Sequence, residues 1–470
     1  MFYPDVKQLL IDAQNNRNNQ MKKEETAGEY DRRQANPIGE ILKDHLYKIL
    51  MSDDFTYQQK KAASMMAKCQ TEELGGYVEY CENCGKAVDF HYCSCNNRNC
   101  PNCQYPMQQK WIEMRKNEII PGIPYYHIIL TCPHTLNPLF QANQSLLLGL
   151  LMRASSRAVI KMCENPDVLG AKPAILSVLH TWSSDLKLHY HVHMLVSGGG
   201  LNSDGNFVRL TDLRDEQKKA REAAKCLKEG IQFDPNKVSN DNDSGNDYFI
   251  NLPALTVLYR GIFMSELREL YQKHKLTLPD NLDYLNDPND WSRFCHKHEV
   301  TDWVGDIEKT SSGGINVVEY FARYSYRTAI SNSRITKYDG KFVHFIVKVK
   351  DKDDPKKRNN KEISLDVYTF IRRFLSHILP KNFSRVRTFG ILSNAQKSKN
   401  LKNIHDQTDG IPYTPSPFKG LKGLDLIKKL MPDKDFGVCP FCKGTVTSIP
   451  FGAALDILKL AEKRQRKRGA

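Results

Sequence analysis

Residues 186–200, LKLHYHVHMLVSGGG, decide the fold expected for this chain. Three histidines stand at alternate positions of this stretch: His189, His191 and His193. The apolar and β-branched residues around them favour a β-strand, and the glycines at 198–200 are expected to end it. Because alternate side chains of a strand point to one face, the three imidazoles are predicted to share a face of a buried strand.

Imidazole is a good ligand for divalent metals, so three histidines in register within an apolar strand favour a metal site. The alternative interpretation is a set of core or surface histidines that hold no ligand. The spacing alone does not name a reaction.

The composition indicates a large protein with a polyanionic partner. At 470 residues the chain is expected to hold two to four domains. Its 68 Lys and Arg exceed its 54 Asp and Glu by 14, which suggests nucleic acid first and an anionic membrane second, although solvated surface charge gives the same excess. No run of about 20 apolar residues and no secretory signal are found, so a cytoplasmic protein without a membrane span is expected.

The 13 cysteines are read as metal ligands and free thiols. Two C-x-x-C pairs are predicted to close one four-sulfur, structural zinc site: Cys81, Cys84, Cys100 and Cys103. Four nearby residues are left over: Cys69, His91, Cys93 and Cys95. The spacing leaves open whether they complete a second metal site, exchange into the first, or are simply buried side chains that bind no metal. Near the C-terminus, Cys439 and Cys442 form a third pair, either half of a second zinc site or plain thiols.

The rest of the pattern mixes strands with helices and predicts an α+β core. Strands are expected at 125–132, 174–182, 185–197 and 342–349, and helices at 107–117, 146–163 and 255–274. Residues 277–300 are expected to be loop-rich, 351–361 a charged turn, and 236–247 a polar insertion. His127, on the first of these strands, is interpreted by default as a core residue, although it would face the histidine strand if the two strands pair.

Residues 317–335, VVEYFARYSYRTAISNSRI, form the second informative stretch. On a helix, Tyr320 and Tyr324 share a face, with Arg323 and Arg327 within about a quarter-turn of it. A phenol can attack a phosphate that guanidinium groups hold, so this pattern suits phosphate chemistry. The alternative is an ordinary helix with core tyrosines and surface arginines. The presence of the histidine strand in the same chain favours the phosphate-chemistry interpretation.

Four segments together resemble the HUH-type rolling-circle transposases of the insertion sequence ninety-one family: SCNNRNCPNCQ, YYHIILTCPH, LHYHVHMLVSGGG and YFARYSYRTAISNSRI. His191-Val192-His193 fits the His-hydrophobe-His motif of that family, and Tyr320 and Tyr324 fit its Tyr-x-x-x-Tyr motif. The resemblance implies an HUH-endonuclease core with a central antiparallel sheet flanked by helices, preceded by a cysteine-rich zinc module.

The activity that the resemblance implies is nicking and rejoining of single-stranded or hairpin DNA at transposon ends. Tyr320 or Tyr324 would form a 5′-phosphotyrosine. The histidines would hold Mg²⁺ or Mn²⁺, with Zn²⁺ as the alternative at the same site: His189, His191 and His193. Arg323 and Arg327 would bind phosphate. Structural Zn²⁺ would occupy the cysteine module. The implied location is the bacterial cytoplasm, at the nucleoid.

The expected domains are a helical arm (1–68), the zinc module (69–106), the catalytic domain (107–350, with an insertion at about 201–300) and a DNA-binding region with a basic tail (351–470). Two other functions stay open. One is a replication initiator or relaxase with the same nicking core. The other is a non-enzymatic zinc protein that binds DNA and uses the histidines as a second structural site.

Overall fold

A computed structural model describes residues 36–229, 231–235, 249–310, 316–351, 354, 357–408, 414–433 and 437–451. Three predicted features lie outside these residues, namely the first 35 residues of the arm, the polar insertion at 236–247 and the basic tail.

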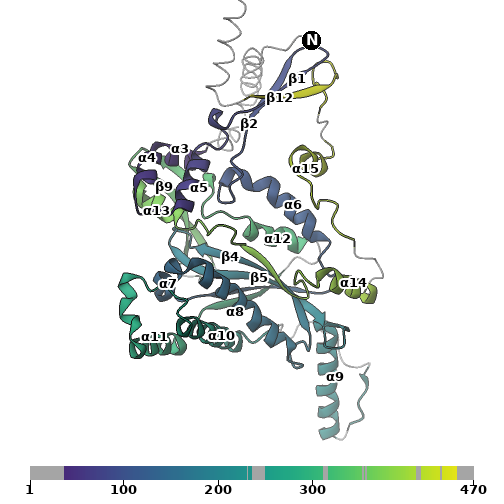
Figure 1. Ribbon diagram of the computed structural model, residues 1–470. Coiled ribbons are helices and arrows are strands. Elements are labelled where there is room, and N and C mark those ends of the chain that lie inside the picture. The colour runs from purple at the N-terminus through teal and green to yellow at the C-terminus, as the bar shows by residue number, and fades with distance from the viewer. Residues whose placement is uncertain are drawn as a thin grey trace, which may run out of the picture.

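A six-stranded antiparallel sheet forms the centre of the molecule (Figure 1). Its strand order is β11 (Val386–Gly390), β4 (Lys172–Trp182), β5 (Leu188–Leu201), β3 (Tyr125–Thr131) and β7 (Gly305–Lys309), and β6 (Phe207–Arg209) pairs with β5. The histidine strand β5 is central in this sheet, and its side chains are buried on both faces, in two different cores.

Alternation along β5 divides its side chains between two cores. Val192, Met194 and Val196 point to a core built with α7 (Asn137–Ala142), α8 (Gln144–Glu164), α10 (Leu252–Gln272) and α11 (Pro288–Val300). Leu195 points to the other side, into a core that contains Trp111 of α6 (Gln104–Lys116) and Phe321 of α12 (Asn316–Ser325). His191 and His193 share the parity of Leu195 and therefore face α12.

A second sheet, of order β10 (Arg358–Asp366), β9 (Phe342–Lys350) and β8 (Ile335–Tyr338), lies beside the first. It shares a core with α13 (Val367–Leu375) and with the first described helices, α3 (Pro37–Asp44), α4 (Leu46–Met51) and α5 (Tyr57–Ala67). The same core contains Cys69, Cys95 and Cys100, so these cysteines are packed into the body of the molecule.

A third, small sheet has the order β12 (Val446–Phe451), β1 (Gly76–Cys81) and β2 (Ala87–Tyr92) and projects from one end of the body (Figure 1). At the opposite end, α9 (Leu210–Glu229) extends away from the sheet. The chain returns from the central sheet to β12 through α14 (Lys397–Thr408) and α15 (Gly423–Leu430).

The predicted α+β class, with an antiparallel sheet and a cysteine-rich module near the N-terminus, is confirmed. Within the described residues, no helix has the length and apolar character needed to span a membrane.

Several sequence-based expectations about single elements are wrong. The glycines 198–200 lie inside β5 instead of ending it. Glycine is needed there because neighbouring backbone leaves no room for a side chain: a Cβ on Gly200 would lie 2.2 Å from the carbonyl oxygen of Lys172. Residues 288–300 form α11, which buries Trp291 and Cys295, and residues 358–361 belong to β10. The tyrosine helix ends at Ser325, so Arg327 lies beyond it.

Candidate histidine–tyrosine site and cysteine clusters

Three histidines meet on one face of the central sheet. His180 of β4 is paired directly with His191 of β5, and His193 lies two residues further along β5. One ligand nitrogen of each lies within 4.8 Å of those of the other two, and all three side chains are buried. This is the size of a cluster that binds one metal ion through three imidazoles.

The structure corrects the predicted ligand set, because His189 is not part of this cluster and His180 is. A strand rises about 3.3 Å per residue, so His189 and His193 are separated by about 13 Å along β5, and the nitrogens of His189 do not converge with those of the other three. His189 instead lies within hydrogen-bond distance of His134, Nδ1 to Nε2 2.9 Å. Antiparallel pairing of the strands predicted at 174–182 and 185–197 was the signal that would have found His180.

The second ring nitrogen of each clustered histidine already has a partner. Nε2 of His180 lies 2.8 Å from the carbonyl oxygen of Tyr324, and Nδ1 of His191 lies 2.8 Å from that of His189. Since a carbonyl only accepts, each of these nitrogens carries the proton. The remaining nitrogens, Nδ1 of His180 and Nε2 of His191, are free to bind a metal, an arrangement typical of ligands oriented by outer hydrogen bonds.

Burial keeps this cluster neutral. It lowers the pKa of His191 to about 3; the charges of His189 and Arg327 lower this pKa further, while the hydrogen bond to the carbonyl of His189 opposes the shift. Burial also holds the pKa values of His180 and His193 well below 6.5, with smaller effects from neighbouring histidines and Arg327. Neutral imidazole is the form that binds metal, so the site is ready for a cation at neutral pH.

His127 of β3 connects the cluster to the tyrosine helix, which corrects its default interpretation as a plain core residue. Its Nε2 lies 2.9 Å from Nδ1 of His193, and its Nδ1 lies 3.1 Å from the hydroxyl of Tyr320. Burial lowers the pKa of His127 to about 4, against an opposing effect of Asp306. A continuous chain of polar contacts therefore runs from the histidine cluster through His127 to a phenol.

Both predicted tyrosines face the histidines. The hydroxyl of Tyr324 donates to that of Tyr320 at 3.3 Å, and the ring of Tyr324 lies over His193 at 4.6 Å between centroids. Burial raises the pKa of Tyr320, and Tyr324 and Glu308 raise it further, whereas Arg323 lowers it. Tyr326 points elsewhere and packs on Trp111.

Packing sets the position of α12. Val317, Val318, Phe321 and Ala322 are buried under the sheet and α6, which leaves the tyrosines half-buried above the histidines. Gln108 of α6 donates to the carbonyl of Ala322 at 3.1 Å, which fixes the two helices together. The predicted meeting of tyrosines and histidines thus depends on the hydrophobic face of one ten-residue helix.

The two predicted arginines lie beside the site with exposed side chains. The charge of Arg323 acts on Tyr320, and the charge of Arg327 acts on all three clustered histidines and on Arg334. Two guanidinium charges therefore act on the site, where the negative charges of Asp306 and Glu308 oppose them.

The cysteines are grouped differently from the predicted four-sulfur site. Cys100 and Cys103 do not join Cys81 and Cys84. They meet Cys69 and Cys95 instead, with sulfur–sulfur distances of 3.5 Å from Cys69 to Cys100 and to Cys103 and 3.7 Å from Cys95 to Cys103. Cys69 follows α5, and the β1–β2 hairpin carries Cys81 and Cys84 away from it, a tertiary arrangement that spacing does not encode.

The second cluster contains Cys81, Cys84, Cys439 and Cys442. His91 and Cys93 belong to neither cluster: His91 is exposed next to Asp89 at 3.5 Å, and Cys93 is half-buried. Of the leftover candidates, Cys69 and Cys95 are the ones that complete a site.

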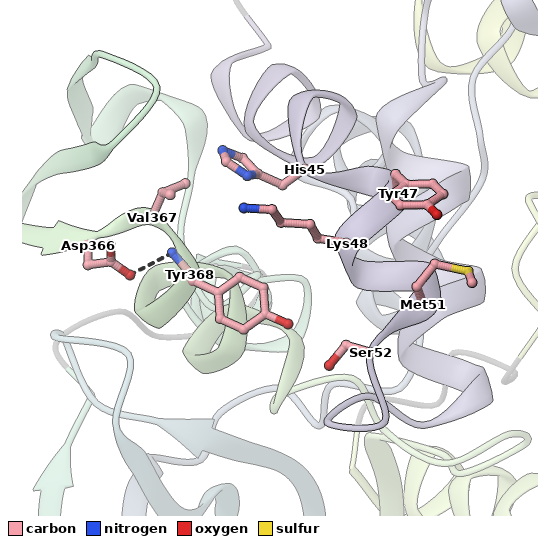
Figure 2. A pocket seen from close by; sticks show the side chains of 8 residues that line it. All are labelled: His45, Tyr47, Lys48, Met51, Ser52, Asp366, Val367 and Tyr368. Atoms are coloured by element: carbon pink, nitrogen blue, oxygen red, sulfur yellow. Dashed lines mark hydrogen bonds between the residues drawn. The ribbon is translucent and has the colours of Figure 1, made fainter.

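A surface hollow of about 550 Å³ lies between α4 and the start of α13, away from these clusters (Figure 2). Its polar groups have structural partners: His45 contacts the hydroxyl of Tyr338 at 3.1 Å, and Asp366 caps α13 by accepting from the backbone of Tyr368 at 2.9 Å.

Comparison with known proteins identifies the class. Residues 174–222 and 230–399, which contain the three clustered histidines and both tyrosines, match a family described as "Putative transposase". Residues 41–132 match a family described as "Transposase zinc-binding domain", named for IS91. The fold, the site and the cysteine module together define a zinc-binding transposase, a DNA-processing enzyme.

Two similar proteins indicate the family of transposases to which the chain belongs. A protein named "Putative transposase y4qJ" of Sinorhizobium fredii is 28% identical over 385 residues, which cover 82% of this chain and 87% of the relative. The transposase for insertion sequence element IS801 of Pseudomonas savastanoi pv. phaseolicola is 24% identical over 359 residues, or 76% of each chain. No solved structure matches. The chain belongs to the IS91 family of insertion-sequence transposases, as the sequence motifs predicted.

Proposed function

We propose that the protein nicks and rejoins single-stranded DNA at transposon ends through a covalent 5′-phosphotyrosine. One observation carries the proposal: Tyr320 is joined through His127 to a buried three-histidine cluster, at 3.1 and 2.9 Å. A core packing role alone would not require three buried neutral imidazoles, two of them with one ring nitrogen fixed by a carbonyl.

The residues present fit a divalent cation, which His180 and His191 would hold through the nitrogens without a carbonyl partner and His193 through the nitrogen that does not face His127. The cation proposed is Mg²⁺ or Mn²⁺, with coordination completed by oxygen atoms of water and DNA. When bound, it would polarise the scissile phosphate and stabilise the negative charge that develops on its oxygens.

The covalent step proceeds by attack of a tyrosine oxygen on the phosphorus atom. A bond forms from phosphorus to the phenolic oxygen, the bond from phosphorus to the 3′ oxygen breaks, and the phenol loses a proton while the 3′ oxygen gains one. The phosphodiester energy is kept in the protein–DNA bond, so rejoining needs no further energy source. Two tyrosines allow one DNA end to be held while the next is cut.

The protonation of the histidines supports Tyr320 as a nucleophile. If Nε2 of His193 binds the cation, its Nδ1 carries the proton and donates to Nε2 of His127. The proton of neutral His127 is then on Nδ1, which donates to the oxygen of Tyr320. This hydrogen bond stabilises the phenolate and opposes the rise in pKa that burial causes.

Arg323 and Arg327 would bind the phosphate, because their exposed guanidinium groups act on Tyr320 and on the histidines respectively. A single-stranded or hairpin DNA end is the proposed partner, since a scissile phosphate must approach a half-buried phenol that a rigid duplex would reach poorly. The proposed location of this activity is the bacterial nucleoid.

Incubation of the full chain with a labelled single-stranded oligonucleotide of the element's end and Mn²⁺ or Mg²⁺ tests the proposal. An SDS-resistant protein–DNA adduct is expected. The double variant Tyr320→Phe with Tyr324→Phe should form none, while the matched control Tyr326→Phe, which alters a packing tyrosine next to the same helix, should form it normally. DNA binding without any adduct, or an adduct that survives in the double variant, would show the proposal to be wrong and would favour a non-enzymatic DNA-binding role.

A further inference from the structure

We propose that Cys81, Cys84, Cys439 and Cys442 hold a second structural zinc ion, which joins the C-terminal end of the described chain to the N-terminal zinc module. The pairs are separated by more than 350 residues and meet through the β1–β12 pairing. Cys439 and Cys442 lie outside both regions that match transposase families. This inference does not depend on the proposed nicking chemistry.

The sulfur geometry fits zinc. A Zn–S bond of about 2.3 Å in a tetrahedral site places the sulfurs about 3.8 Å apart. Cys81 and Cys442 lie 3.4 Å apart, Cys84 and Cys439 lie 3.8 Å apart, and all four sulfurs fall within 4.8 Å of one another. A disulfide needs about 2.05 Å and pairs only two sulfurs, so it does not explain a four-sulfur cluster.

The two C-x-x-C segments have the same local structure, although they come from opposite ends of the chain. The backbone N–H of Gly85 donates to the carbonyl of Cys81, and that of Lys443 to the carbonyl of Cys439, both at 2.9 Å. The backbone N–H of Cys81 donates to the carbonyl oxygen of Lys86 at 2.9 Å, and that of Cys439 donates to the carbonyl oxygen of Gly444 at 2.8 Å. Matched turns of this kind present two sulfurs each to one tetrahedral ion.

The left-handed backbone at equivalent positions strengthens the match. Gly85 has φ +69° and Lys443 has φ +63°. A lysine adopts this conformation at a cost, so the second turn is held in the same shape as the first despite an unfavourable residue. A shared ligand for the two turns accounts for this.

The segment that ends at Cys439 and Cys442 is fixed along α6. The carbonyl of Thr414 accepts from Asn117 at 3.1 Å, Ser416 donates to the carbonyl of Glu113 at 3.1 Å, and the carbonyl of Leu421 accepts from Lys110 at 2.5 Å. Residues 414–421 thus follow α6 back toward its N-terminal end, where Cys103 belongs to the other cysteine cluster (Figure 1). Because α6 supports the tyrosine helix, one zinc site anchors the start of α6 and the other anchors the segment laid along it.

Zinc content of the purified full chain tests the inference. Mass spectrometry under native conditions should find two zinc ions per chain. The variant Cys439→Ser with Cys442→Ser should retain one, and the matched control Cys226→Ser, which alters a half-buried cysteine outside the clusters, should retain two. One zinc in the unaltered chain, still present in the double variant, would overturn the inference.

A second measurement works on the unaltered protein, so it does not depend on a variant that folds. Cys84 and Cys442 are exposed and would react readily with N-ethylmaleimide if they were free. With zinc bound they should be protected, and a chelator should make them reactive at least tenfold faster, with Cys226 unchanged as the internal reference. Rapid labelling of both before chelation, or a disulfide between them in the peptide map, would contradict the zinc site.

Discussion

At the residue scale, His127 is the connection between the histidine cluster and the tyrosines. It contacts His193 at 2.9 Å and Tyr320 at 3.1 Å and holds no ligand position in the cluster. We interpret it as a positioning residue that acts on the nucleophile through a hydrogen bond.

Replacement of His127 by Ala is therefore expected to slow adduct formation by about 10²-fold, the lower part of the range for a lost proton-handling group. The phenolate of Tyr320 would lose its donor, so the pH at which the single-turnover rate is half-maximal should rise. Glu308→Gln should move the same profile to lower pH, because Glu308 raises the pKa of Tyr320. A uniform loss of rate at every pH would indicate a purely structural role for His127.

His180 and His189 give a matched pair for metal binding. His180→Ala removes a clustered nitrogen and should weaken Mn²⁺ binding by about 100-fold or more, as measured by titration calorimetry. His189→Ala removes a half-buried ring outside the cluster and should change the affinity less than about tenfold, since its carbonyl still orients His191. The opposite ranking would restore the ligand set expected from the sequence motif.

At the scale of elements, the hydrophobic face of α12 decides where the tyrosines lie. Phe321 is fully buried and its ring meets His127 edge-on at 5.8 Å. Phe321→Ala should lower the free energy of unfolding by about 3–5 kcal/mol, measured by urea denaturation. Glu319→Ala on the exposed side of the same helix, which loses only a 3.7 Å surface contact to Lys116, should change it by less than about 0.5 kcal/mol. Equal effects of the two substitutions would mean that α12 is not packed as described.

At the scale of the whole molecule, buried neutral histidines link stability to pH. Burial lowers the pKa of His377 to about 4 from 6.5, and its ring contacts Thr181 and the carbonyl of Leu186, both at 3.1 Å. The unfolded chain takes up the proton first, so this contribution to stability is complete above about pH 6.5 and is lost as the pH falls toward 4.

His377→Gln should remove this pH dependence in part. Between pH 6.5 and pH 4, the variant is expected to lose roughly 2–3 kcal/mol less free energy of unfolding than the unaltered chain, from about 1.4 kcal/mol for each pKa unit. Denaturation at both pH values provides the measurement. Identical losses would assign the acid sensitivity to other groups.

The net positive charge of the whole chain, +14, is expected to contribute to DNA binding. If Arg323 and Arg327 bind phosphate, Arg327→Ala should weaken binding of single-stranded DNA at all sequences and reduce the slope of log K against log salt concentration by about 0.7, the value for one phosphate contact on a single strand. An unchanged slope would place Arg327 away from the DNA.

The sequence by itself determined part of the site, namely His191, His193 and the two tyrosines of α12. Alternating histidines within apolar residues predicted a strand with one polar face, and Tyr320 and Tyr324 are four residues apart, a separation that any helix places on one side. These are local periodicities of the backbone, which hold wherever the element forms.

Only the tertiary structure decided the partners. His180 joined the cluster because it is the residue that β4 pairs directly with His191, whereas His189 lies four residues from His193 along β5 and is outside the group of converging nitrogens. The cysteine pairs exchanged partners for the same reason: Cys81 and Cys84 meet Cys439 and Cys442 through β1–β12 pairing, and Cys100 and Cys103 meet Cys69 and Cys95 in the packed body. Spacing along a chain fixes which side chains share a face, but the identity of the neighbour across that face follows from how the strands and helices pack.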